Sequence, residues 1–295
     1  MITLLGIPLQ VLLGQLLLGL INGAFYAVLS LGLALIFGLL NIVNFAHGAQ
    51  YMMGAFAAWL LLTVAGVGYW PALLLVPPAL GAVGMLTEIL LLRRLAKLDP
   101  LYGLLATFGL ALVIEGLFRQ VYGVSGQPYP VPRSLQGGVN LGFMFLPIYR
   151  GWVVVASLMV CLASWAAIER TRLGALLRAG TENPGLVRAF GVNVPLLITV
   201  TYGFGAGLAG LAGVLAAPIY SVSPLMGTNI IITVFAVVVI GGMGSILGSV
   251  LTGFGLGLVE GLTKVFYPEG STTVIFVIMV AVLLIRPAGL FGKAA

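Results

Sequence analysis

The chain has 295 residues, of which 61% are hydrophobic and only 7% are charged. Because an ordinary soluble domain carries roughly 25% charged residues, this composition excludes a soluble globule, which could not cover its surface with so few polar groups. The formal net charge of +6 would suggest nucleic acid as the partner of a soluble protein, but the basic residues lie mainly in connections between apolar runs, where membrane topology places them. We expect an all-α, polytopic bundle of transmembrane helices, formed as a single domain by residues 1–295.

Apolar runs follow one another along the chain, and crossing the hydrocarbon core of a membrane takes about 20 such residues in a helix. The runs cover residues 10–39, 50–66, 71–92, 101–122, 151–168, 195–217, 227–243, 246–266 and 271–286. The first run is long enough for one tilted helix or for two shorter helices that break near Asn22 and Gly23. We expect about eight or nine crossings, with broken or glycine-rich helices among them.

A polar interruption at residues 41–50 separates the first two runs. Asn41, Asn44, His47 and Gln50 carry side chains that are costly in lipid, so they must face protein or a water-filled path. Broken helices with polar side chains commonly line the substrate routes of transporters. These four residues are therefore candidates for a translocation path, although a hydrated loop facing the cytoplasm explains the same pattern.

Few ionisable residues lie inside the apolar runs. Glu115 precedes Arg119, and Glu260 precedes Lys264, by four residues, which is the favourable order for an ion pair on one helix. We interpret both pairs as structural. Glu88 stands close to the basic residues of the following connection and is a weaker candidate for a proton or substrate site.

The basic residues define the expected orientation. By the positive-inside rule, connections rich in Lys and Arg face the cytoplasm, and the C-terminal end falls on that side too. The residues concerned are Arg93, Arg94 and Lys97, then Arg170, Arg172, Arg178 and Arg188, and finally Arg286 and Lys293. The connection at 123–150 is rich in Pro and Gly and is expected outside the cell.

The basic connection at about 170–195 contains signals for a short helix. Asn183 suits an N-cap, Pro184 suits the first helical position, and Gly191 can end the helix. A helix over about 184–190 would place Leu186, Val187 and Phe190 on one side and Arg188 on another. Such an amphipathic helix could lie on the membrane surface, or it could dock into a groove of a soluble partner.

Small residues recur at intervals of four. In lipid there is little hydrophobic force between helices, so association depends on close backbone packing, which glycine permits. These glycines indicate tight helix packing. A more specific interpretation of the same pattern is that the helices slide or rock against each other during transport. The glycines are Gly19 and Gly23, Gly203 and Gly207, Gly244 and Gly248, and Gly253, Gly257 and Gly261.

The chain lacks the residues for several kinds of chemistry. One histidine and one cysteine, His47 and Cys161, do not suffice for a metal site rich in these residues. The sequence contains no phosphate-binding G-x-x-x-x-G-K-[ST] motif. We expect no enzyme activity and no cofactor bound by this chain, so that any ATPase that drives it is a separate polypeptide.

Several motifs, in collinear order along nearly the whole chain, resemble the branched-chain amino acid ABC transporter permeases of the LivH and LivM type. The NFAHG form of the first motif, at 44–48, looks more like LivH than LivM. The motifs are NFAHG at 44–48, YMMGA at 51–55, RAGTENPGLVRAFGVN at 178–193, GLAGLAG at 207–213, GGMGSILG at 241–248 and RPAGLFG at 286–292.

This resemblance implies a permease subunit of an ATP-driven importer in a bacterial-type inner or plasma membrane. It would move branched-chain amino acids, or a related small polar solute such as urea, an amide or another amino acid, by alternating access. Its partners would be a second, LivM-like permease, two cytoplasmic ATP-binding subunits that hold ATP and Mg, and an extracytoplasmic solute-binding protein. Coupling to the ATPase would fall to Glu182, Asn183, Pro184, Leu186, Val187, Arg188, Phe190 and Gly191.

A different class of transporter remains as the alternative. The chain could be a self-sufficient, ion-coupled secondary transporter or a channel, with Glu88 and the 41–50 segment as the coupling-ion or pore site. The scarcity of ionisable residues in the spans speaks against proton coupling, whereas sodium coupling needs only carbonyl and hydroxyl oxygens.

Overall fold

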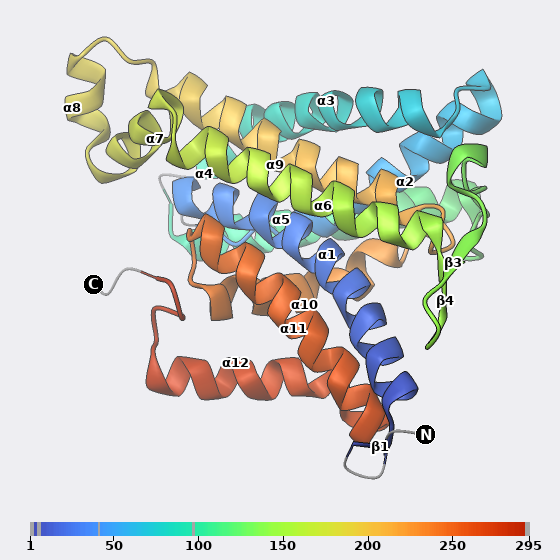
Figure 1. Ribbon diagram of the computed structural model, residues 1–295. Coiled ribbons are helices and arrows are strands. Elements are labelled where there is room, and N and C mark those ends of the chain that lie inside the picture. The colour runs from blue at the N-terminus through green and yellow to red at the C-terminus, as the bar shows by residue number, and fades with distance from the viewer. Residues whose placement is uncertain (1–2, 5–6, 41, 96–97, 293–295) are drawn as a thin grey trace.

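The computed structural model describes residues 3–4, 7–40, 42–95 and 98–292. Helices dominate it (Figure 1). The α-helices are α1 (Leu9–Leu40), α2 (Ala46–Ala65), α3 (Tyr69–Thr87), α4 (Arg93–Leu95), α5 (Pro100–Tyr122), α6 (Ile148–Glu169), α7 (Arg172–Glu182), α8 (Pro184–Ala189), α9 (Val194–Ala216), α10 (Met226–Gly241), α11 (Ile246–Phe266) and α12 (Thr273–Ile285).

Short elements occupy the connections. A π-helical turn, η1 (Glu88–Leu92), joins α3 to α4, and 3-10 turns lie at η2 (Arg133–Leu135) and η3 (Pro268–Gly270). Two antiparallel hairpins complete the described part of the chain. Strand β1 (Thr3–Leu4) pairs with β2 (Ile7–Pro8), and β3 (Gly138–Asn140) pairs with β4 (Phe145–Pro147), with Val139 opposite Leu146.

The spanning helices coincide with the apolar runs. Within the described residues, seven helical segments are long and apolar enough to cross a membrane, and α10 and α12 are shorter apolar helices. The all-α, polytopic bundle expected from the sequence is therefore confirmed. The first run forms one helix that continues through Asn22 and Gly23. The expected interruption between 227–243 and 246–266 is present, because Gly242 and Gly244 adopt positive φ angles of 100° and 85°.

The bundle has two distinct ends (Figure 1). The basic segments α4 and α7–α8 lie at one end, together with the C-terminal end of the described chain, whereas β1 and the β3–β4 hairpin lie at the other. The three basic regions thus share one side of the bundle, as a common membrane orientation requires. Lys97 and Lys293, which the sequence placed on this side, lie outside the described residues.

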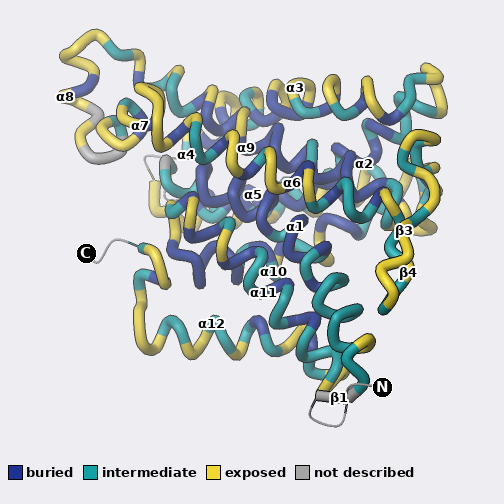
Figure 2. Tube along the Cα trace, in the orientation of Figure 1, coloured by how far each residue is buried: buried dark blue, intermediate teal, exposed yellow. Residues whose placement is uncertain are grey.

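The core includes residues 21–36 of α1, the first part of α2 and most of α9, where buried residues predominate (Figure 2). Of the 18-residue apolar window in α1, 78% is buried, whereas only 11% of that in α5 is buried. The large, fully buried side chains include Phe25 on α1, Phe56 on α2 and Tyr202 on α9. Helix α5 is therefore a peripheral helix, and α1 is central.

Glycine brings α1 and α11 into backbone contact. A Cβ atom at Gly257 would lie 2.4 Å from the carbonyl oxygen of Gly19 and 2.4 Å from Cα of Gly23. Likewise a Cβ at Gly253 would lie 2.7 Å from Cα of Ala27, and one at Gly261 would lie 2.4 Å from the carbonyl oxygen of Gln15. No side chain fits at these distances, so only glycine allows this approach.

The other predicted glycines also stand at close contacts. A Cβ at Gly203 would lie 3.0 Å from the carbonyl oxygen of Gly81, and one at Gly207 would lie 3.0 Å from that of Pro77, so both face α3. Gly248 approaches the C-terminal turn of α10, and Gly244 supplies the positive φ of the α10–α11 turn. Whether these helices slide during transport remains a hypothesis.

We expect Gly257→Ala to lower the free energy of unfolding by about 1–3 kcal/mol, the usual cost of overpacking, because its methyl group would meet the α1 backbone. Thermal unfolding in detergent measures this effect. Gly255→Ala is the matched control, since Gly255 lies on the same helix and faces open space. Equal stability of the two variants would contradict the contact.

Candidate functional site

The connection after α6 folds into a capped two-helix element, α7 and α8. The Asn183 side-chain oxygen accepts a hydrogen bond from the Leu186 backbone N–H at 3.0 Å, and Pro184 begins the helix, as the sequence predicted. Gly191 follows α8 with φ of 81°. The side chain of Asn193 then caps α9 by accepting from the Leu196 backbone N–H at 3.1 Å. The link from α8 to α9 is therefore short and locally fixed by caps.

The exposed apolar surface at α8 contains fewer residues than the sequence predicted. Phe190 is 79% exposed, and Leu186, four residues earlier, is exposed beside it, as is Arg188. Val187, which the sequence placed on the same side, is only 7% exposed and turns into the protein. Glu182 ends α7 and Pro184 begins α8, but their side chains lie outside the described residues.

Sequence reasoning missed α7. This helix buries Gly174 and Leu177, and its Arg178 pairs with Glu169 at the end of α6 at 3.0 Å. The spacing of the two buried residues, i and i+3, is a helical signal. The sequence analysis had predicted a helix in this connection only over about 184–190, from the cap signals at Asn183, Pro184 and Gly191.

The polar segment after α1 does not form an open path among the described residues. Asn44, just before α2, is buried, as are His47 and Gln50 in the first turns of α2, whereas Asn41 lies outside the described residues. The side-chain amide of Asn44 donates to the Tyr202 hydroxyl on α9 at 2.9 Å, and His47 Nε2 lies 3.0 Å from the Leu29 carbonyl oxygen on α1. These polar groups therefore tie α2 to its two core neighbours, and a role in the path stays a hypothesis.

Glu88 is buried and forms an ion pair with the largely exposed Arg93 at the basic end of the bundle. Its carboxylate is 2% exposed and accepts from Arg93 Nε at 3.1 Å and Arg93 Nη2 at 2.8 Å, while the Thr199 hydroxyl donates to it at 2.8 Å. The π-helical turn η1 places Arg93, five residues later, beside Glu88. Because the carboxylate already has these donors, the geometry favours a structural joint between η1 and α9.

We expect Arg93→Ala to lower the free energy of unfolding by about 1–3 kcal/mol, because Glu88 would be left buried without its cation. Thermal unfolding measures this change, and Glu88→Gln in the Arg93→Ala background should restore part of it. Arg94→Ala, at the exposed neighbouring position, is the control. If Arg94→Ala lowers the free energy of unfolding by the same amount, the effect comes from loss of positive charge in general and not from the Glu88 contact.

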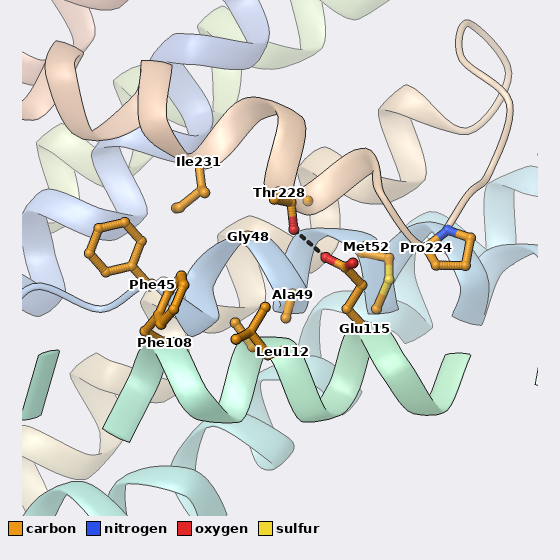
Figure 3. Close-up of a pocket in the computed structure, with 12 residues that line it drawn as sticks. Phe45, Gly48, Ala49, Met52, Phe108, Leu112, Glu115, Pro224, Thr228 and Ile231 are labelled. Atoms are coloured by element: carbon orange, nitrogen blue, oxygen red, sulfur yellow. Dashed lines mark hydrogen bonds between the residues drawn. The ribbon is translucent and has the colours of Figure 1, made fainter. Parts of the chain in front are cut away.

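A pocket opens between α2, α5 and the start of α10 (Figure 3). Its cavity volume is about 40 Å³. Its walls are largely apolar and include Phe45, Met52, Phe108, Leu112 and Ile231. Residues Gly48 and Gly227 form the line where α2 and α10 touch, since a Cβ at Gly48 would lie 2.8 Å from the Gly227 carbonyl oxygen.

One carboxylate faces this pocket. Glu115 is 9% exposed, accepts from Arg119 Nη2 at 2.7 Å and also accepts a hydrogen bond from the Thr228 hydroxyl (Figure 3). At the opposite end of the pocket the ring of Phe45 meets that of Phe108 edge-on, with centroids 5.9 Å apart. The ion pair predicted for Glu115 is confirmed. Its place in a pocket was not predictable, since the walls come from three separate segments.

A multi-pass bundle of apolar helices with an exposed, capped element at its basic end defines a polytopic membrane protein. A family model for the permease component of branched-chain amino acid transport systems matches residues 15–283. The chain therefore belongs to this family, as its motifs indicated. No solved structure matches it.

Relatives extend over nearly the full length of the chain. The high-affinity branched-chain amino acid transport system permease protein BraD of Pseudomonas aeruginosa is 30% identical, with 95% of each chain covered. The permease protein LivH of Escherichia coli is 27% identical over 93% of this chain and 94% of the relative. LivM of Escherichia coli is 28% identical over 90% of this chain but only 67% of the relative. These coverages confirm the LivH-like character.

Proposed function

We propose that this chain is the permease subunit of an ATP-driven importer that moves branched-chain amino acids, or a related small solute, across an inner or plasma membrane. The observation that carries the proposal is the α7–α8 element, which presents Leu186 and Phe190 to the outside at the end of the bundle that holds the basic connections. An exposed apolar pair on a short capped helix suits insertion into a groove of a partner. The names of the relatives support the substrate class.

The proposed partners would bind this chain on both sides of the membrane and within it. Two cytoplasmic ATP-binding subunits would hold ATP and Mg and receive α8, because this chain has no phosphate-binding motif of its own. A second, LivM-like permease would complete the membrane unit, and an extracytoplasmic binding protein would deliver the solute. The positive-inside rule supports placing α4, α7, α8 and the C-terminal end in the cytoplasm.

The route of coupling follows from the caps. Movement of the ATP-binding subunits would displace α8. Because the Asn183 and Asn193 caps fix the starts of α8 and α9, and the link between the two helices is short, α9 would move together with α8. Helix α9 lies in the core and contacts α3 through Gly203 and Gly207. A shift of α9 would therefore reposition the core helices and support alternating access. An ion-coupled transporter has less support, because Glu88 is already paired with Arg93.

We expect Phe190→Glu to lower ATP-dependent uptake roughly 30-fold while leaving the amount of inserted protein unchanged. Removing an anchor of an interface costs about 2 kcal/mol, and each 1.4 kcal/mol is a tenfold change. Uptake into vesicles and ATP hydrolysis by the assembled complex are measured together, with Phe190→Leu as the conservative control. Normal uptake by Phe190→Glu would remove the basis of the proposal.

The side of the membrane on which α8 lies can be tested separately. A thiol introduced by Leu186→Cys should react with a membrane-impermeant maleimide only from the cytoplasmic side, because α8 is exposed there under this proposal. The native Cys161 is buried and adds little background. Reaction from the outer side would show that 170–195 cannot meet a cytoplasmic ATPase.

A further inference from the structure

An apolar groove lies between α6 and α11, and we refer to it as the α6–α11 groove. Its cavity volume is about 200 Å³. Its walls include Leu158, Leu162 and Trp165 on α6, and Leu247, Val250 and Leu251 on α11. Trp165 lies one turn before the end of α6, and Leu247 lies in the first turn of α11. The groove therefore opens at the end of the bundle that carries the basic segments (Figure 1).

A cation lies at the mouth of this groove. Arg170 directly follows α6, is exposed, and places its guanidinium carbon Cζ 5.1 Å from the centroid of the Trp165 ring. A guanidinium group at this distance is attracted by the negative face of an indole ring. Because Trp165 is also a wall of the groove, the contact holds a positive charge at one end of an apolar channel.

Arg170 has no carboxylate partner among the residues that the structure describes. Ion pairs in that part of the chain involve the cations Arg93, Arg119, Arg178 and Lys264. Glu169, the acidic residue next to Arg170, pairs with Arg178 at 3.0 Å. Arg172, two residues after Arg170, is exposed and adds a second positive charge. The N–H donors of Arg170 can therefore bind an anion from outside the chain.

The position of the groove in the membrane indicates which anion fits. Tryptophan and arginine side chains are typical of the boundary between hydrocarbon and water, so Trp165 and Arg170 mark that boundary at the basic end. Leu158, two turns before Trp165 on α6, lies deeper in the hydrocarbon. A phospholipid has the same order of groups, with its phosphate at the boundary and its acyl chains below. A groove of about 200 Å³ accepts an acyl chain, whereas a helix roughly 10 Å in diameter cannot enter it.

The larger groove on the other side of α6 lacks a cation. It runs along α3, α6 and α9, has a cavity volume of about 720 Å³, and is lined by residues such as Ala163, Ala167 and Gly207. None of its lining residues is charged. Acyl chains of any lipid can fill that groove, whereas the α6–α11 groove, with Arg170 at its mouth, can distinguish one headgroup from another.

We propose that the α6–α11 groove binds an anionic phospholipid, with one acyl chain between the two helices and the phosphate on the guanidinium group of Arg170. Arginine suits this ligand because its planar fork of N–H donors matches two phosphate oxygens. Phosphatidylglycerol keeps the negative charge of its phosphate, whereas phosphatidylcholine cancels it with a trimethylammonium group. The site therefore selects anionic over zwitterionic lipid. This inference is independent of the proposed function, because it involves neither the transported solute nor the ATP-binding subunits.

The bound lipid would lie at the junction of α6 and α7. Gly174 on α7 packs so closely against the carbonyl oxygen of Ile168 on α6 that no Cβ atom fits between them, and Arg178 on α7 holds Glu169. Arg170 lies between these contacts in the chain. A phosphate on Arg170 therefore adds a further constraint to the junction from which the α7–α8 element projects.

Tryptophan fluorescence tests the site, because Trp165 lines the groove. The full-length chain is placed in phosphatidylcholine nanodiscs that contain a small fraction of phosphatidylglycerol with brominated acyl chains, which quench a tryptophan on contact. The Trp165 signal is the difference between the wild type and Trp165→Phe. We expect brominated phosphatidylglycerol to quench this signal more than the same fraction of brominated phosphatidylcholine. Equal quenching by the two brominated lipids would overturn the proposed selectivity.

Arg170→Gln should lower the preference for phosphatidylglycerol about tenfold, the effect of losing one hydrogen bond to a charged group. Because Arg170 is exposed, this substitution leaves the packing of the core intact. Arg172→Gln is the matched control, since Arg172 is also exposed but is not the residue that lies over the Trp165 ring, and it should lower the preference much less. An equal loss in the two variants would assign the preference to surface charge in general and overturn the site.

Two further measurements examine the acyl chain. Val250→Phe fills the groove without a change of charge and should remove the excess quenching by phosphatidylglycerol, whereas Gly255→Phe, on the same helix and facing open space, should retain it. Soluble glycerol phosphate carries the phosphate without a chain and should not displace the lipid. Displacement by glycerol phosphate, or full excess quenching in Val250→Phe, would show that Arg170 binds a free anion and not a lipid seated in the groove.

Discussion

Close backbone contact through glycine is the constraint on which this structure depends, because lipid supplies almost no hydrophobic force between helices. The contact of α1 with α11 at Gly19 and Gly257 joins the central helix to the C-terminal half. The contact at Gly54 and Gly210, where an added Cβ would lie 2.4 Å from a carbonyl oxygen, joins α2 to α9. The contact of Gly48 with Gly227 sets the back of the pocket. Glycine contacts between helices therefore shape both the core and the pocket.

Interactions between buried polar groups also hold the helices of the bundle together. A buried charge or amide is costly in lipid unless it has a partner. Glu88 meets Arg93 and Thr199, and Asn44 meets Tyr202. Both interactions end on α9, which also follows directly from the α8 element. Helix α9 is therefore the element through which an event at the basic end of the bundle can reach the core.

The C-terminal segment after α12 adds a further tie at that end. The backbone N–H groups of Leu290 and Phe291 donate to the carbonyl oxygens of Ile240 and Gly241 at 2.8 and 3.2 Å. Carbonyl groups at a helix C-terminus lack partners within the helix, so this segment satisfies the end of α10. Since α10 begins at the pocket, a short helix that is fixed at both ends can keep the pocket's shape.

The sequence by itself determined the spans, the common side of the basic connections and the caps around α8, because these depend on composition and on hydrogen bonds between near neighbours. It also predicted the Glu115–Arg119 and Glu260–Lys264 pairs, which lie one helical turn apart. Only the tertiary structure decided that Val187 is buried and that the Asn44–Gln50 face packs into the core. It alone brought α2, α5 and α10 around one pocket, because such neighbours are set by packing between segments far apart in the chain.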